Sequence, residues 1–166
     1  MLHFTTKSDM KVTLLVVGKT EDSWIREGLD VYAGRLKHYL PFNLVELPAL
    51  KQSGKMLPEH QKEKEGELIL KACAGADRVF LLDEQGKEYS STGFSTLLQQ
   101  QMNASVKHLI FVVGGPFGFS DSVYKRAQGK IALSRMTLTH QMVRLFITEQ
   151  IYRGMTILKG EKYHHE

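Results

Sequence analysis

The sequence predicts a single α/β domain with a mainly parallel sheet and flanking helices. Strand-like apolar runs alternate with segments of helical periodicity along the whole chain. Two of the runs, Lys11–Gly18 and His108–Val113, are continuously apolar, as in strands buried on both faces of a parallel sheet. A length of 166 residues with 42% hydrophobic and 24% charged residues suits one globular domain, and no repeat or linker divides it.

The first strand, Lys11–Gly18, ends in a glycine. Asp22 or Ser23 can cap the helix that follows, which Pro41 stops. Its apolar residues recur at helical spacing: Trp24, Ile25, Leu29, Tyr32, Leu36 and Tyr39. Phe42–Leu47 is predicted as the second strand.

The middle of the chain supplies two more helices and two more strands. Ala49–Pro58 is predicted as a mobile loop, and Glu59–Ala74 as a helix. Arg78–Asp83 is the third predicted strand, Ser90–Met102 a helix, and His108–Val113 the fourth strand.

The last third begins with a short helix through Gln128 that Ser120 and Asp121 can cap. Lys130–Ser134 is the fifth predicted strand, and Leu138–Arg153 the last helix. On that helix Val143, Phe146, Ile147 and Ile151 form an apolar stripe predicted to face the core.

Residues Met1–Asp9 are polar and lack periodicity. We expect them to form a disordered extension, with Met10 a plausible alternative start and 10–166 the domain. No run has the length of a membrane span, and no leader shows a basic start before an apolar core. Cys73, the single cysteine, excludes an internal disulfide and suits the reducing cytosol. Its apolar helical context predicts a buried, inert thiol.

The net charge of +4 is concentrated near the C-terminus. Val123–Glu166 holds eight Lys/Arg and three Asp/Glu, giving +5, and the other 122 residues carry −1. A basic face suits a polyanion such as RNA, and solubility explains the charge equally well.

Two glycine motifs follow apolar strands. Gly18-Lys19-Thr20 is not a phosphate-binding P-loop, because Thr13 stands where that motif needs its first glycine. Gly114-Gly-Pro-Phe-Gly118 does not fit the dinucleotide-binding fingerprint. It nevertheless lies at the carboxyl end of a buried strand, where open α/β sheets bind ligands, and glycines let backbone approach a ligand closely. A plain strand–helix turn is the alternative.

The last helix and the tail carry polar groups in a pattern. His140, Arg144, Thr148 and Tyr152 share one helix face, and Glu149 and Arg153 form an i,i+4 pair. This face suits either solvent or a phosphate or base. The closing Tyr163-His-His-Glu166 carries two histidines, but no metal motif accompanies them, so no metal is predicted.

Taken together, these segments resemble the RlmH family of SPOUT-class methyltransferases, from Met10 to Glu166. The resemblance rests on their order and spacing: the Lys11–Gly18 strand, Leu81-Leu-Asp83, Val113–Gly118, Leu133–Leu138, Arg144, Glu149–Arg153 and Tyr163-His164. One departure is Thr139, where the family usually has proline, so we expect a less rigid turn there.

The resemblance implies an S-adenosylmethionine-dependent enzyme that methylates N3 of a pseudouridine in 23S rRNA of the assembled 70S ribosome. It also implies a C-terminal trefoil knot and a homodimer whose cofactor pocket lies beside the subunit interface. The enzyme would be cytoplasmic, and neither a membrane nor DNA is an expected partner. The residues that would hold the cofactor are Leu82, Gly114, Leu133, Ser134, Arg135, Met136, Thr137 and Leu138.

Methylation of an imide nitrogen requires loss of its proton, and histidine is a natural base near neutral pH. His164 is the first candidate and His140 the second. The expected RNA ligands are Arg144, Tyr152, Arg153, Tyr163 and His165. The alternatives are a SPOUT methyltransferase acting on another RNA such as tRNA, a non-catalytic RNA- or ribosome-binding module, and a flavodoxin-like nucleotide binder.

Overall fold

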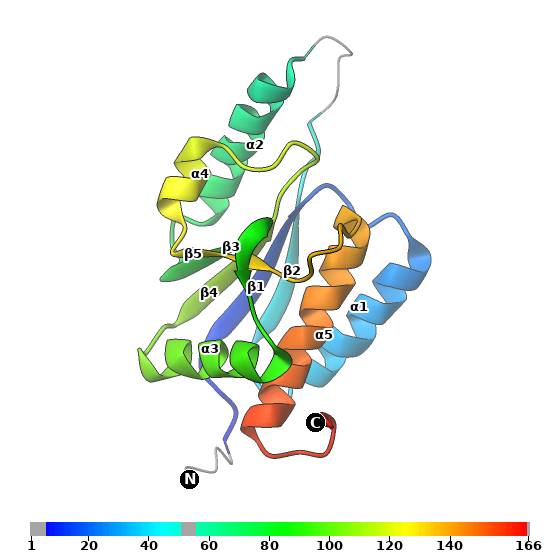
Figure 1. Ribbon diagram of the computed structural model, residues 1–166, viewed down its shortest axis with the longest axis vertical. Coiled ribbons are helices and arrows are strands. Elements are labelled where there is room, and N and C mark those ends of the chain that lie inside the picture. The colour runs from blue at the N-terminus through cyan, green and yellow to red at the C-terminus, as the bar shows by residue number, and fades with distance from the viewer. Residues whose placement is uncertain (1–5, 51–55, 166) are drawn as a thin grey trace.

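The computed structural model describes residues 6–50 and 56–165 (Figure 1). Half of the predicted loop Ala49–Pro58, and the first five residues of the predicted extension, lie outside the described residues. The end of that extension is tied to the fold, because the backbone N–H of Ser8 donates to the carbonyl of Tyr39 over 2.8 Å. Met10 is buried, and the domain boundary expected there stays a prediction.

Five parallel strands form one sheet, in the order β2-β1-β4-β3-β5. Their bounds are Lys11–Val17 (β1), Phe42–Leu47 (β2), Arg78–Glu88 (β3), His108–Val113 (β4) and Gly129–Ala132 (β5). The predicted α/β class and all five predicted strands are confirmed. The two continuously apolar runs are neighbours inside the sheet, where helices cover both faces.

The helices form a layer on each face of the sheet (Figure 1). Their bounds are Ser23–Leu36 (α1), Pro58–Ala72 (α2), Ser91–Asn103 (α3), Asp121–Arg126 (α4) and His140–Leu158 (α5). One core cluster joins the sheet to α1, α3 and α5, and a second joins it to α2 and α4. Cys73 is fully buried in the second cluster, as predicted, and burial raises its pKa to about 11.

Three helices begin with a side-chain cap. Ser90, Ser120 and Thr139 each accept a hydrogen bond from the backbone N–H three residues ahead. Thr139 thus fixes the start of α5 through a 3.2 Å bond from Met142, so the loosening expected from the missing proline is offset. Asp22 stands at the N-cap position of α1 without a side-chain cap, contrary to prediction.

Strand β3 is longer than predicted, and it bends around β5. Leu82 and Lys87 both pair with Ile131, with a shift in register between them. At Gly86 an added Cβ would lie 2.5 Å from the backbone nitrogen of Ile131, so only glycine permits this close approach. The resemblance places a knot in the C-terminal segment that begins near this bend. The threading itself stays a prediction.

Helix α5 packs against α1 and α3 as well as the sheet, so more than one of its faces is buried. Ile147 and Ile151 lie in the core as predicted, but Phe146 remains 37% exposed. Trp24 on α1 is also exposed, against the helical-stripe prediction. The face predicted to be polar turns inward at Arg144 and Thr148, which are both buried. Within the described part of the chain, no helix has the length and apolarity needed to cross a membrane.

Candidate functional site

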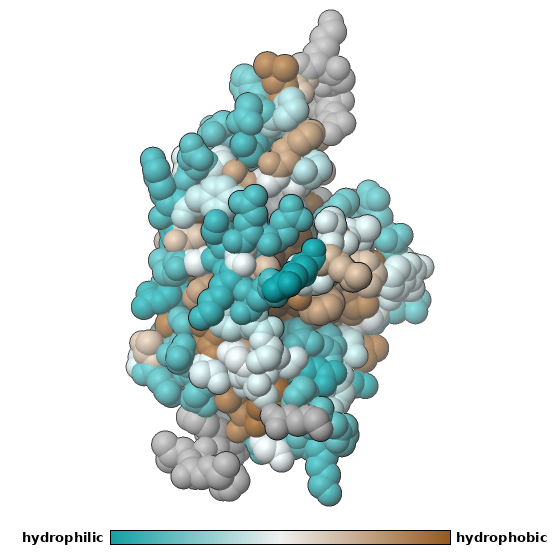
Figure 2. Space-filling view, viewed as in Figure 1, coloured by the Kyte–Doolittle hydropathy of each residue, from teal (hydrophilic) through white to brown (hydrophobic). Residues whose placement is uncertain are grey.

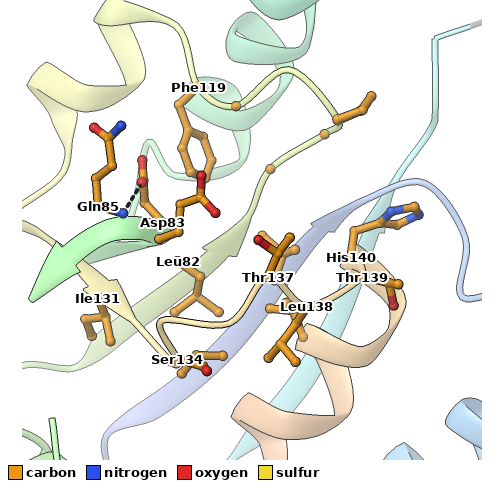
Figure 3. A pocket seen from close by; sticks show the side chains of 18 of the residues that line it. Leu82, Asp83, Gln85, Phe119, Ile131, Ser134, Thr137, Leu138, Thr139 and His140 are labelled. Atoms are coloured by element: carbon orange, nitrogen blue, oxygen red, sulfur yellow. Dashed lines mark hydrogen bonds between the residues drawn. The ribbon is translucent and has the colours of Figure 1, made fainter. Parts of the chain in front are cut away.

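A cavity of about 760 Å³ opens at the carboxyl ends of β3, β4 and β5 (Figure 3). This is the edge of an open α/β sheet at which ligands bind, and the volume is within the range of small-molecule sites. Three chain segments contribute most of its lining: Leu82–Gln85 at the bend within β3, Val113–Phe119 at the end of β4, and the stretch from Leu133 to Val143 after β5. Segments distant in sequence therefore meet because parallel strands end at one edge.

Seven of the eight residues predicted to hold a cofactor line this cavity: Leu82, Gly114, Leu133, Ser134, Met136, Thr137 and Leu138. The eighth, Arg135, does not. Its side chain is 87% exposed and makes a 3.0 Å ion pair with Glu88. A turn presents successive side chains in different directions, so a contiguous segment does not point into one cavity as a whole.

Several lining residues were not predicted. Val113, Pro116, Phe117 and Phe119 belong to the glycine turn, and Tyr124 reaches the cavity from α4. The phenol of Tyr124 donates a hydrogen bond to Asp83 Oδ2. Burial, and then the Asp83 carboxylate, raise the pKa of Tyr124 to about 12, so it stays a neutral donor at neutral pH. The one available sequence signal for this pair was the position of Asp83 at the end of the predicted strand Arg78–Asp83.

Side chains from other parts of the protein pack tightly against the glycine turn Gly114–Gly118. Gly118 has a φ of +79°, in the left-handed region that favours glycine. A Cβ on Gly114 would lie 2.9 Å from the ring of Phe119. A Cβ on Gly115 would collide with the carboxyl group of Glu65, whose Cδ would be 2.9 Å away. The backbone therefore forms this wall of the cavity, with no room for side chains.

The two candidate bases lie far apart. His140 is exposed at the start of α5 and lines the cavity (Figure 3). Nδ1 of His164 lies 3.2 Å from Nη1 of Arg153, near the other end of the helix. Thirteen residues separate His140 from Arg153, which is about 20 Å along a helix. Within one chain, His164 does not reach the cavity.

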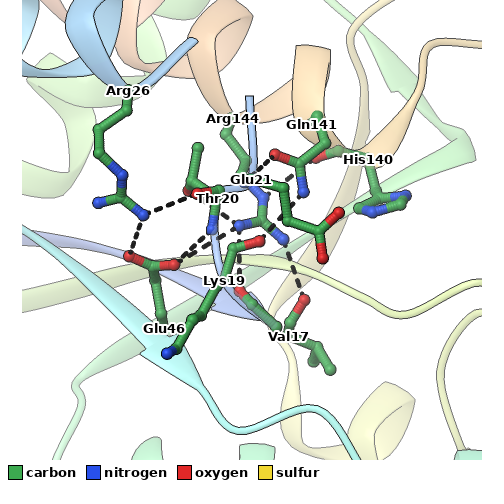
Figure 4. A network of polar contacts seen from close by, with 10 residues as sticks. Val17, Lys19, Thr20, Glu21, Arg26, Glu46, His140, Gln141 and Arg144 are labelled. Carbon is green, nitrogen blue, oxygen red and sulfur yellow. Dashed lines mark hydrogen bonds and ion pairs between the residues drawn. The ribbon is translucent and has the colours of Figure 1, made fainter. Parts of the chain in front are cut away.

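Arg144 is buried and binds the protein itself (Figure 4). Its guanidinium donates to the carbonyls of Val17 and Gly18, each over 3.0 Å, and to the Thr20 hydroxyl over 2.9 Å. Burial lowers the pKa of Arg144. The carboxylate of Glu46, 4.0 Å away, raises this pKa and so offsets part of the effect of burial. The expected role of Arg144 as an RNA ligand is therefore wrong, because its donors are committed to the end of β1.

The other expected RNA ligands gather near the C-terminal end of α5. Glu149 accepts from the guanidinium of Arg153 at 2.7 Å and from the hydroxyl of Tyr163 at 3.0 Å. The hydrogen bond to Glu149 is the main reason that the pKa of Arg153 is raised. The ring of Tyr152 packs against Tyr163 with centroids 4.8 Å apart. His165 is exposed.

Sequence reasoning missed the partners that α1 and the turn after it supply to this cluster. Tyr32 and Tyr39 each lie 5.8 Å from Tyr152, centroid to centroid. The Arg35 guanidinium stands over the rings of Tyr32 and Tyr152. Cations over aromatic faces interact favourably, so this surface presents both stacking and positive charge. No local motif links α1 to α5, because they meet only in the folded protein.

Residues 10–164 match the model of a protein family whose description reads "Predicted SPOUT methyltransferase". The chain therefore belongs to the SPOUT methyltransferases. Within that class its curated relatives carry the name ribosomal RNA large subunit methyltransferase H. The relative from Flavobacterium johnsoniae is 51% identical over 95% of this chain and 100% of its own. The relative from Parabacteroides distasonis is 53% identical over the same shares.

Solved structures show a more remote likeness. The SpoU methyltransferase AviRb from Streptomyces viridochromogenes, crystallised with AdoMet, is 12% identical over 91% of this chain and 60% of its own, with a TM-score of 0.45. A likeness at this level adds no weight to the assignment, which rests on the family match and the curated relatives.

Proposed function

We propose that this protein transfers a methyl group from S-adenosylmethionine to N3 of a pseudouridine in 23S rRNA of the assembled 70S ribosome. The observation that carries the proposal is the cavity at the carboxyl ends of β3, β4 and β5, in a chain about half identical to the large-subunit rRNA methyltransferases. The family membership supplies the reaction class, and the relatives' name supplies the RNA.

The cavity suits S-adenosylmethionine in size and lining. Apolar walls from Leu82, Ile131 and Leu138 can enclose an adenosine, while Ser134 and Thr137 offer hydroxyls (Figure 3). The side-chain-free wall at Gly114 and Gly115 lets backbone groups approach the ligand. When bound, the cofactor supplies a methyl group on a sulfonium, and the protein contributes alignment and exclusion of water.

The target N3 must lose its proton as the methyl group arrives, so a base has to lie at the mouth of the cavity. His140 occupies that position in the same chain. His164, the first candidate, serves only if the tail of a second subunit reaches the cavity. We therefore infer a homodimer in which the tail of one subunit completes the site of the other.

The surface of α1 and α5 supports such a dimer. These helices pack side by side and leave Trp24, Val31 and Phe146 exposed, at 56%, 50% and 37%. Figure 2 shows an apolar area over these helices, bordered by hydrophilic surface. An isologous dimer formed through this face would bury these side chains and place the two α5 helices near each other.

In such a dimer, the residues gathered near the C-terminal end of α5 would contact the RNA at a site formed by both subunits. Arg153 and Tyr163 are held by Glu149, and Tyr152 completes the aromatic group. Aromatic rings can stack on a base flipped out of the ribosomal RNA, and the cations can neutralise phosphates. Since the substrate is a ribosome, the protein acts in the cytoplasm.

The test uses 70S ribosomes that lack the modification, the protein and methyl-labelled S-adenosylmethionine. We expect one labelled pseudouridine in 23S rRNA, located by mass spectrometry, and little label on protein-free 23S rRNA. Label found in tRNA instead would favour the alternative substrate. Failure to bind S-adenosylmethionine in calorimetry, with ribosomes present, would favour a non-catalytic binding module.

A further inference from the structure

Glu65 is a buried carboxylate behind the glycine turn of the cavity. It lies on α2, and only 3% of the residue is exposed. Oε1 accepts a 3.0 Å hydrogen bond from Nε2 of Gln61, one helical turn earlier. Oε2 is the one buried side-chain nitrogen or oxygen in the described part of the chain that has no hydrogen-bond partner.

The carboxyl group points at the turn that forms the cavity wall. A Cβ added to Gly115 would lie 2.9 Å from both Cδ and Oε1 of Glu65, and Oε2 would be closer still. Gly115 itself lines the cavity. Only the thickness of this backbone separates the carboxyl group from a ligand in the cavity.

None of the ion pairs among the described residues includes Glu65. An acidic side chain buried without a counter-charge destabilises a fold, and such groups are concentrated at functional sites. A glutamine here would keep the shape and the bond to Gln61 without that cost. The acidic side chain therefore calls for an explanation, and a positively charged ligand on the far side of Gly115, which would stabilise its ionised form, provides one.

We propose that Glu65 sets the cavity's preference for the cationic methyl donor over its neutral product. This inference rests on the proposed function. S-adenosylmethionine carries a sulfonium charge, which is lost when the methyl group leaves and S-adenosylhomocysteine forms. Glu65 attracts the sulfonium of S-adenosylmethionine through a wall of low dielectric constant. The attraction is weaker for S-adenosylhomocysteine, which lacks that charge. Glu65 thereby favours binding of the donor and release of the product without touching either.

The experiment is calorimetric titration of the full chain with S-adenosylmethionine and, separately, with S-adenosylhomocysteine. Glu65→Gln should raise the Kd for S-adenosylmethionine about ten- to thirtyfold, the range expected for charges roughly 8–12 Å apart at an effective dielectric constant of about 20. The Kd for S-adenosylhomocysteine should stay within about twofold. Thermal unfolding of ligand-free Glu65→Gln should occur at the wild-type temperature or above it, since a buried acidic group without a counter-charge is removed.

Two further variants act as controls. Glu67 is exposed on the same helix, so Glu67→Gln changes the net charge equally and should leave both constants within about twofold. Glu65→Asp keeps the charge on a shorter side chain, so the ratio of the two constants should stay near that of the wild type even if both rise. This second variant also decides the matter if Glu65→Gln does not fold.

Equal weakening of both ligands by Glu65→Gln would show a purely structural role and overturn the inference. So would unchanged constants, or an Glu65→Asp protein whose ratio shifts as far as that of Glu65→Gln. A wild-type protein that binds neither ligand would instead overturn the proposed function, and this inference with it.

Discussion

Nη1 of Arg144 lies 3.0 Å from the carbonyl oxygen of Gly18, joining the last helix to the end of the first strand across 126 positions of sequence. The same guanidinium also binds the carbonyl of Val17 and the hydroxyl of Thr20 (Figure 4). These bonds fix the start of α5, and with it His140, beside the cavity. Arg144 thus supports the site without facing the substrate.

Arg144→Lys should lower the free energy of unfolding by about 2–4 kcal/mol, because a single ammonium cannot satisfy the acceptors that the guanidinium binds in a buried place. Urea unfolding followed by circular dichroism measures this. Arg135→Lys, at an exposed ion pair, should change stability by less than about 0.5 kcal/mol. A stable Arg144→Lys protein with weakened ribosome binding would instead restore Arg144 as an RNA ligand.

Gly115→Ala should weaken S-adenosylmethionine binding by at least about tenfold, because its Cβ would displace either the turn or Glu65. Calorimetry measures the affinity. Gly34→Ala is the matched control, since nothing lies within 4 Å of a Cβ at this position of α1. That control should bind normally and unfold at an equal or higher temperature, because alanine favours a helix over glycine. Tight binding by Gly115→Ala would place the ligand elsewhere.

The two candidate bases are separated by single-turnover methyl transfer at saturating ribosomes. If His164 is the base, His164→Ala should slow transfer about 10²- to 10⁴-fold, and His140→Ala should have a much smaller effect. The reverse result would assign the proton to His140. His60, exposed on α2, provides the control variant His60→Ala, which should react at the wild-type rate.

The composite dimer predicts complementation between two inactive proteins. A cavity variant such as Gly115→Leu, mixed in equal amounts with His164→Ala and allowed to exchange subunits, should recover about a quarter of wild-type activity. Half of the dimers are then mixed, and each of these has one intact site. Each variant exchanged only with itself is the control. No recovery, with exchange verified by mass spectrometry, would show that each chain builds its site alone.

Cys73 predicts a loss of stability at alkaline pH. Burial raises its pKa to about 11 in the folded protein, above the value of about 8.5 for an exposed thiol. The thiol therefore favours the fold fully below pH 8.5, and this contribution is lost as pH rises toward 11. The stability difference between wild type and Cys73→Ala should shrink by up to about 1.4 kcal/mol per pH unit over that window. A constant difference measured by urea unfolding would contradict this.

Much of the fold could be predicted from the sequence, because local signals specify it. Apolar runs gave all five strands, and Ser90 and Ser120 stand at helix starts as their capping chemistry predicts. The cavity was also predictable in part, since glycines after a buried strand point to the carboxyl edge of a sheet. The bend of β3 around Ile131 was not, because the register depends on a strand that follows much later in the chain.

Spacing and strand ends are local properties of the chain, so the fold class, the family and the segments that form the cavity follow from the amino-acid order alone. Which side chains are free to act depends on how the elements pack. Packing of α5 on α1 and α3 buries Arg144 and holds His164 far from His140, and α2 brings the unpaired carboxylate of Glu65 against Gly115. Those outcomes depend on contacts between distant segments, which no periodicity within a single helix can reveal.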